Sequence, residues 1–192
     1  MNHTYLEKII ANIQDISEQV AEKFGKLSAE QLNWKSLAEH WSIGQCLDHL
    51  VTTNRTYYGV FKILIEGQYR PSFWQRMPVI PGILGNMIIQ ATQPEYEKKS
   101  KTFAVFEPIQ SPVKEEVVQE FLSHQLEFID FLNQLDQIEN HRIVISSPAS
   151  RWIIYRLDDC LKLLSVHEKR HLLQAMGVLG NCRFPQPKKQ IN

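Results

Sequence analysis

Apolar residues recur at steps of three and four positions in four long stretches of this chain. This spacing places the apolar side chains on one face of an α-helix. The stretches cover about residues 4–24, 43–66, 112–136 and 157–178. In the first stretch the apolar face consists of Leu6, Ile9, Ile10, Ile13, Ile16, Val20 and Phe24. Four amphipathic helices of this length predict an all-α protein built as a four-helix bundle.

Serine residues mark the predicted starts of a short turn, at Ser28, and of two of the helices. In a capping box, a serine before the helix pairs with a glutamine or glutamate three residues later. The chain has two such patterns, Ser28 with Gln31 and Ser42 with Gln45. A third start is predicted at Ser111, because Pro112 follows it and proline favours the first position of a helix.

The link between the second and third helices, residues 68–111, is by far the longest connection. It is rich in proline and includes a possible short apolar helix over about residues 82–93. Long structureless loops are uncommon in compact domains, so we expect this link to pack on the bundle as a crossover or lid. Its length permits the second and third helices to run parallel. The β-branched run 143–145 is interpreted as an extended connector outside any sheet.

Composition narrows the class of protein. The chain has 192 residues, with 21 Lys+Arg against 21 Asp+Glu, and this balance argues against a general nucleic-acid binder. The length fits one domain, which we place at residues 1–182, followed by a flexible tail at 183–192. No apolar run is long enough to span a membrane, no secretory signal is visible, and three widely spaced cysteines form no disulfide framework. We therefore expect a cytoplasmic protein.

Two histidines in the fourth predicted helix are the strongest chemical signal. His167 and His171 are four residues apart, so they lie one turn apart on one helix face and can bind the same metal ion. They share a stripe with Cys160, Leu164 and Val178, which points them into the bundle. Buried imidazoles need polar partners, and a divalent metal would satisfy both.

Residues 167–171 spell His-Glu-x-x-His, the signature of zinc metalloproteases, in which the glutamate is the general base. Those enzymes take a third ligand downstream, but no acidic residue follows Glu168 and no histidine follows His171. Gln174 also stands where the extended signature has glycine. A protease is therefore disfavoured. Glu168 stays a candidate general base; the alternative is a solvated glutamate paired with Lys169 or Arg170.

A third metal ligand must then come from upstream, and His49 in the second predicted helix is the best candidate. Three neutral histidines leave coordination positions open for water and substrate, as in catalytic sites. His124 is either a further ligand or, more in keeping with its apolar stripe, a hydrogen-bonded core histidine. Cys46 and Cys160 are candidate thiolate ligands or buried apolar residues. The remaining histidines are expected at the surface: His3, His40 and His141.

The segments Trp-Ser-Ile…His-Leu at 41–50 and His-Glu-x-Arg-His-x-x-Gln at 167–174 resemble the DinB-like (DinB/YfiT) superfamily. The resemblance covers nearly the whole chain, including the helix order and the long second connection. It implies a four-helix bundle of unusual connectivity. It also implies a divalent metal, commonly zinc or nickel, held by one histidine of the second helix and two of the fourth, here His49, His167 and His171.

That superfamily includes bacillithiol S-transferases and mycothiol-dependent maleylpyruvate isomerases. The resemblance therefore implies a metal-dependent transferase acting on a small-molecule substrate with a low-molecular-weight thiol, and a homodimer. A metal-dependent hydrolase and a non-catalytic metal-binding or interaction protein remain as alternatives. Under the catalytic hypotheses, the apolar segment around residues 79–91 would line or cover the site.

Overall fold

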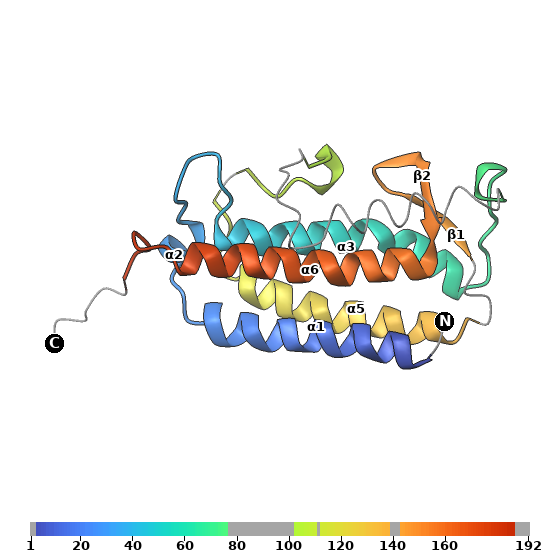
Figure 1. The fold of residues 1–192 in the computed structure, drawn as a ribbon, viewed down its shortest axis with the longest axis horizontal. Coiled ribbons are helices and arrows are strands. Elements are labelled where there is room, and N and C mark those ends of the chain that lie inside the picture. Colours follow the sequence, from blue (N-terminus) through green and yellow to red (C-terminus); the bar gives the residue numbers. More distant parts are fainter. Residues whose placement is uncertain (1–2, 77–101, 111, 139–142, 187–192) are drawn as a thin grey trace.

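The computed structural model describes residues 3–76, 102–110, 112–138 and 143–186, and all structural statements below concern this part of the chain (Figure 1). The chain is mostly helical, which confirms the predicted all-α class. The helices and strands are α1 (His3–Phe24), α2 (Ala29–Asn33), α3 (Ile43–Ile65), α5 (Val117–Asp136), α6 (Leu157–Leu179), β1 (Val144–Ser147) and β2 (Ser150–Arg156). Two short 3-10 turns are η1 (Trp74–Arg76) and η2 (Ala104–Phe106).

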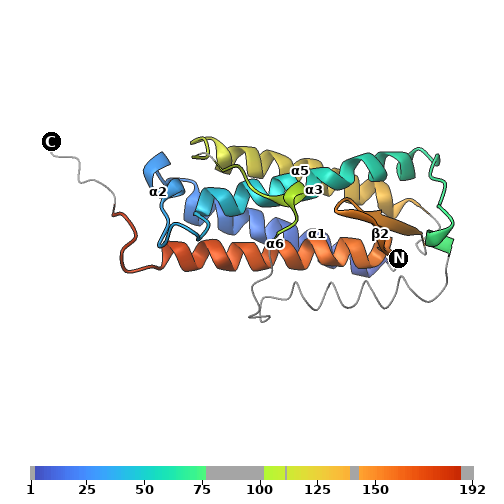
Figure 2. The same ribbon diagram turned by 90° about the horizontal axis from the view of Figure 1, so that it is seen from above.

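The four long helices α1, α3, α5 and α6 form a bundle. Helix α3 packs on α5 and α6, and α1 packs on the same two helices from the other side. The colour gradients in Figures 1 and 2 show that α3 and α5 run in the same direction, as the long link permits, whereas α6 runs antiparallel to both. Within the described residues, no helix has the length and apolar character needed to cross a lipid bilayer.

Both predicted capping boxes are present. The Ser28 hydroxyl accepts the backbone N–H of Gln31, and the Gln31 side chain accepts the N–H of Ser28 in return. Ser42 and Gln45 make the same reciprocal pair at the start of α3. Ser42 is completely buried, so its hydroxyl satisfies a helix N–H group that water cannot reach.

The predicted start of the third helix at Pro112 is wrong. Helix α5 begins at Val117, and Glu116 precedes it without a side-chain cap. Residue Val113 is held in place by Asn33, whose side chain donates to the Val113 carbonyl and accepts its N–H, at 3.0 and 2.7 Å. These contacts with α2 satisfy the backbone of Val113 outside a helix, which explains the later start. Ser111 lies outside the described residues.

The interpretation of residues 143–145 as a connector outside any sheet is also wrong. Strand β1 pairs with β2 as an antiparallel hairpin, with Ile145 opposite Tyr155, and the register shifts between Ser146 and Ser147. Ile145 is fully buried and Tyr155 nearly so, so the hairpin's inner face contributes to the core. The missed signal was a second β-rich run, Trp152–Tyr155, after a short turn.

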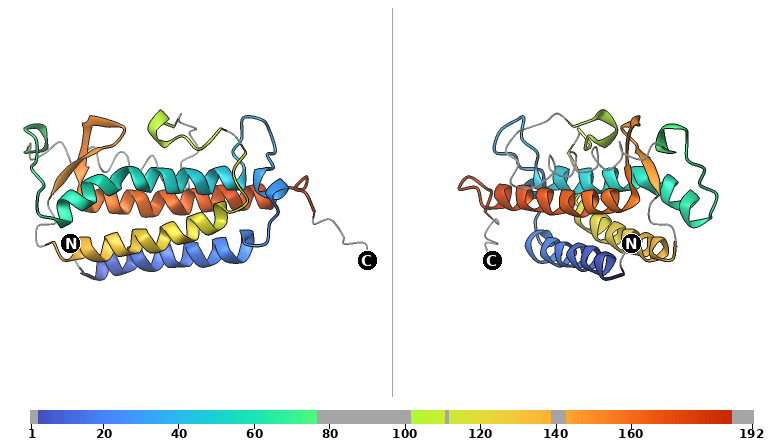
Figure 3. Two further views of the ribbon diagram at one scale, coloured as in Figure 1. Left: turned by 180° about the vertical axis from the view of Figure 1, so that it is seen from behind. Right: turned by 45° about the vertical axis from the view of Figure 1, so that its right-hand side comes forward.

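Part of the long link lies across the bundle. Residues 102–110, called the strap below, contain η2 and pack on α3. Figures 2 and 3 show the strap, the hairpin and the loop before α3 on the same side of the bundle, over α3 and α6. The predicted helix at 82–93 and the predicted covering segment at 79–91 lie outside the described residues.

The core consists of two apolar clusters separated by polar residues. One cluster includes Leu6, Ile13, Tyr57, Phe61, Phe128, Leu132 and Leu164. The other includes Ile16, Phe24, Leu47, Leu50, Phe121, Leu172 and Ala175. Between them along α3, α5 and α6 lie several buried polar residues. Four of these are linked by hydrogen bonds, and we call them the polar layer: Asn54, His124, Gln125 and Glu168.

Candidate metal centre

The three histidines that the sequence predicted as ligands lie together between α3 and α6. The Nε2 atom of His167 is 3.1 Å from Nε2 of His49 and 3.1 Å from Nε2 of His171. The three residues form a group whose candidate ligand atoms all lie within 4.8 Å of one another. Helix α6 supplies two of them because four residues make slightly more than one turn, and α3 packs antiparallel beside it with His49 at the same level.

Protons alone cannot satisfy this arrangement. The Nδ1 atom of His49 lies at hydrogen-bond distance from the carbonyl oxygen of Phe106, which only accepts, so Nδ1 carries the proton and Nε2 of the neutral ring presents a lone pair. A single proton on Nε2 of His167 can then serve only one of its two 3.1 Å contacts. The other 3.1 Å contact is left without a hydrogen bond of its own.

A divalent metal ion fits the same three atoms. Metal–nitrogen distances of about 2.0–2.1 Å place the nitrogens of two neighbouring ligands roughly 3 Å apart, close to the observed separations. Burial lowers the pKa of His49 to about 4 and that of His171 to about 3, and it holds the pKa of His167 well below its usual value. All three rings are therefore neutral near pH 7, the form that binds metals.

Trp41 forms one wall of this group. Its indole ring stacks on His171 with centroids 5.5 Å apart and an interplanar angle of 25°. It also packs on His49 at a centroid distance of 4.7 Å. Trp41 directly precedes the buried cap Ser42, so the capping box holds the backbone next to the residue that carries the indole. An aromatic wall restricts the access of water to the histidines.

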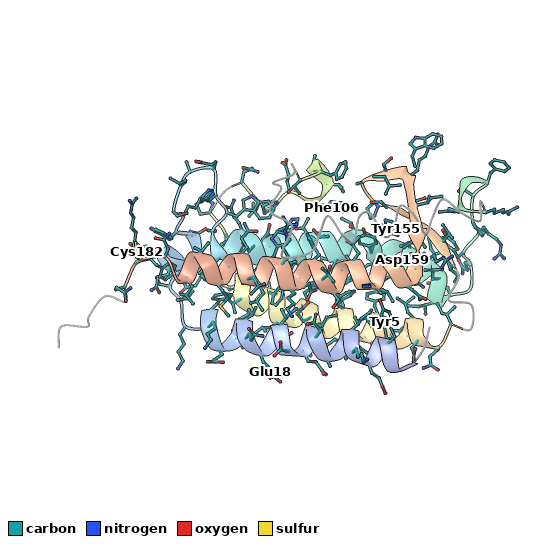
Figure 4. The ribbon with its side chains drawn as sticks, in the orientation of Figure 1. Tyr5, Glu18, Phe106, Tyr155, Asp159 and Cys182 are labelled. Atoms are coloured by element: carbon teal, nitrogen blue, oxygen red, sulfur yellow. The ribbon has the colours of Figure 1, made fainter. Side chains whose placement is uncertain are left out.

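The strap orients His49 from the opposite end of its ring. The Phe106 carbonyl accepts its Nδ1–H, and Figure 4 labels Phe106 on the side of the bundle formed by α3 and α6. Two more residues of α3 hold the strap: Asp48 accepts the backbone N–H of Ile109 at 2.8 Å, and Gln45 donates to the Ile109 carbonyl at 3.0 Å. Partners of this kind fix the tautomer and the orientation of a metal-binding histidine.

Glu168 is completely buried in the polar layer, so the alternative of a solvated glutamate is wrong. Its carboxylate accepts a hydrogen bond from the side-chain amide of Asn54 and another from Gln125, each at 2.7 Å. Burial raises its pKa to about 7, although both amide contacts act in the opposite direction. A role as general base stays a prediction.

The other candidate ligands lie outside the three-histidine group. Both ring nitrogens of His124 have partners in the core, Tyr58 at 2.8 Å and Asn54 at 3.2 Å, as expected for a core histidine. Cys46 and Cys160 are buried free cysteines, and burial raises the pKa of both thiols. His40 is partly exposed and pairs with Ser36. His141 lies outside the described residues, and so does the side chain of His3.

Sequence reasoning missed two contributors to the site. One is Trp41, for which its position next to a capping box and eight residues before His49 was the available signal. The Phe106 contribution comes from a backbone carbonyl, for which the sequence holds no signal.

Comparisons with known proteins support one family. The family model described as the DinB superfamily matches residues 14–175. The comparison with curated proteins gave no match, and the comparison with solved structures gave none either.

Proposed function

The chain belongs to the DinB superfamily, and from this membership together with its converging histidines we propose that it binds one divalent metal ion through His49, His167 and His171. The observation that supports this most directly is that Nε2 of His167 lies 3.1 Å from Nε2 of both His49 and His171, two contacts that one proton cannot both satisfy. Imidazole ligands suit zinc and nickel, the metals that the superfamily resemblance implies.

The proposal extends to transfer chemistry with a low-molecular-weight thiol. A divalent ion on three neutral imidazoles would lower the pKa of a thiol and leave coordination positions open for it. In such a transfer, the thiolate sulfur forms a bond to an electrophilic carbon, the leaving group departs with the bonding electron pair, and the thiol proton goes to solvent. The chain's own contribution is to orient His49 through the Phe106 carbonyl and to limit water access through Trp41.

Metal analysis of the His49→Ala variant tests the metal site. We expect purified wild type to hold about one divalent ion per chain after zinc or nickel loading, and His49→Ala to lose it because two ligands remain on one helix. His40→Ala is the matched control, since His40 contacts Ser36 and lies outside the group. Wild type without bound metal, or a His49→Ala variant that retains it, would sink the proposal.

Turnover separates the transferase from a binding protein. Metal-loaded wild type is incubated with small thiols and carbon electrophiles, and product is followed against metal-free protein and His49→Ala. We expect thioether formation that requires both the metal and His49. If metal binds but no thiol reacts, the transferase part fails, and hydrolysis of small esters or amides under the same conditions would favour the hydrolase instead.

A further inference from the structure

Glu168 occupies a position from which it can set the geometry of the histidine group. It follows His167 directly and precedes His171 by three residues, so all three belong to the same turn of α6. Its carboxylate, with no exposed surface, accepts one amide of α3 and one of α5. One side chain therefore ties the turn that carries two histidines to both helices that pack beside it.

The contacts of Glu168 continue through the polar layer. The Asn54 amide group that donates to Glu168 also lies 3.2 Å from Nε2 of His124, and the other nitrogen of His124 lies 2.8 Å from the Tyr58 hydroxyl. Asn54 lies on α3 about one and a half turns after His49. The network thus joins the helix of His49 to the helix of His167 and His171 at a second level, next to the histidines themselves.

Stability alone does not explain such a layer. A buried carboxylate is costly to desolvate, and well-packed apolar residues of similar volume often stabilise a core as well or better. What a directional network adds is alignment, because its bonds form at only one rotation and register of the helices. The histidine group needs such alignment: the 3.1 Å separation between His49 and His167 joins α3 to α6, and a small rotation of α6 would break it.

We propose that Glu168 is a positioning residue of the histidine group: its hydrogen bonds to Asn54 and Gln125 fix the rotation of α6 at which His167 and His171 meet His49. The inference rests on the proposed metal site, because that site is the reason why the histidines need to be aligned. The alignment itself is a property of the chain without metal and can be measured there. Gln125 is the most telling partner, since α5 supplies no member of the histidine group.

Four variants test whether Glu168 acts by aligning the helices, by its charge, or only by stabilising the fold in general. Glu168→Met keeps the length but removes both acceptors. Gln125→Leu removes one donor on α5. Glu168→Gln keeps the shape, since its oxygen can accept from Asn54 while its amide donates to Gln125 after that side chain turns over. Ser165→Ala is the matched control, because it removes a 2.8 Å interhelical bond from the same region of α6, but to Asn12 on α1.

Two measurements are made on each variant: cobalt(II) affinity by titration, and the ring nitrogen resonances of His167 and His171 by NMR in metal-free protein. We expect Glu168→Met and Gln125→Leu to bind cobalt(II) about tenfold more weakly and to shift the ring resonances, as for other residues that orient ligands. Glu168→Gln and Ser165→Ala should stay close to wild type in both. If Glu168→Met does not fold, Gln125→Leu gives the answer on its own.

The outcomes distinguish this inference from the metal proposal. Wild-type cobalt affinity and unshifted resonances in Glu168→Met and Gln125→Leu would overturn the positioning role. A Glu168→Gln variant as weak as Glu168→Met would overturn it too, because charge and not hydrogen bonding would then be decisive. If wild type binds no cobalt(II), the metal proposal fails, and the resonances of the metal-free protein still decide whether Glu168 aligns the histidines.

Discussion

The three histidines of the group are held by different means. The Nδ1–H of His49 has a fixed acceptor in the Phe106 carbonyl, whereas Nδ1 of His167 is buried and has no hydrogen-bond partner among the described residues. Ring orientation at His49 therefore depends on the strap, and at His167 on how α6 is rotated. The two sides of the group are set by contacts that lie far apart in the sequence.

Trp41 is placed to report on this group. Its ring lies 4.7 Å from the ring of His49 and 5.5 Å from that of His171, so a paramagnetic ion bound there should quench its fluorescence. We expect nickel(II) or cobalt(II) to quench part of the wild-type tryptophan emission in a saturable way. Trp41→Phe should lose that quenching.

The control for this experiment is Trp152→Phe. Trp152 is 55% exposed on the hairpin, where Arg151 lies over its ring. This variant should keep the saturable quenching. Equal quenching in Trp41→Phe and wild type would place the bound ion elsewhere.

At the scale of elements, α3 links the cap, the strap and the histidine group. Within its first two turns it supplies Gln45, Asp48 and His49, all of which contact the strap. The strap's chain then continues to Val113, whose side chain packs against the start of α3 at Gly44. A substitution at this end of α3 should therefore also affect the packing of the crossover.

Gly44 and Gly59 make a matched pair for testing that packing. A Cβ atom at Gly44 would lie 2.1 Å from a methyl group of Val113 and 3.1 Å from the Leu32 carbonyl, whereas one at Gly59 would meet nothing within 4 Å. We expect Gly44→Ala to lower the free energy of unfolding by about 1–2 kcal/mol, because overpacking outweighs the better helix propensity of alanine.

Gly59→Ala, on the same helix, should raise the free energy of unfolding by about 0.5–1 kcal/mol, since only the propensity changes. Urea unfolding of both variants measures the difference. Stabilisation of similar size at the two positions would show that Val113 does not pack tightly on α3.

The elements that the sequence predicted correctly are those governed by local signals. Helices α1, α3 and α6 follow from apolar periodicity, and the starts of α2 and α3 from serine caps three residues before a glutamine. The prediction of where α5 starts was wrong because Asn33, 80 residues earlier, holds Val113 outside the helix. Local preference at Ser111–Pro112 could not reveal that competing contact.

At the scale of the whole molecule, the candidate site also divides into residues that local sequence signals predict and residues that only long-range contacts bring together. His167 and His171 could be found because four-residue spacing on one helix is a local property. His49 could be found because it lies in a predicted helix, within the segment 41–50 that resembles the superfamily. The polar layer could not be predicted from the sequence. Its hydrogen bond between Asn54 and Glu168 spans 114 residues, and nothing in either local sequence requires that bond. Only the packing of α3, α5 and α6 brings those side chains together.

The polar layer should also make the stability of the molecule depend on pH. Burial, with a contribution from nearby Arg55, lowers the pKa of His124 from 6.5 to about 4. The unfolded chain then binds a proton at this residue at a higher pH than the folded chain does. Stability from this group is therefore complete above the unfolded pKa and is lost as pH falls from there toward the folded pKa.

Between about pH 7.5 and about pH 5 the loss at His124 amounts to about 2 kcal/mol. Glu168, whose pKa burial raises to about 7, acts in the opposite sense, and it is present in every variant compared. We expect His124→Gln, in a chelator that removes metal, to lose about 2 kcal/mol less than wild type over this interval by urea unfolding. His40→Gln, outside the polar layer, should match wild type. If the free energy of unfolding depends on pH equally in His124→Gln and wild type, the folded chain accommodates a protonated His124. The polar layer would then tolerate a positive charge that its burial between two apolar clusters should exclude.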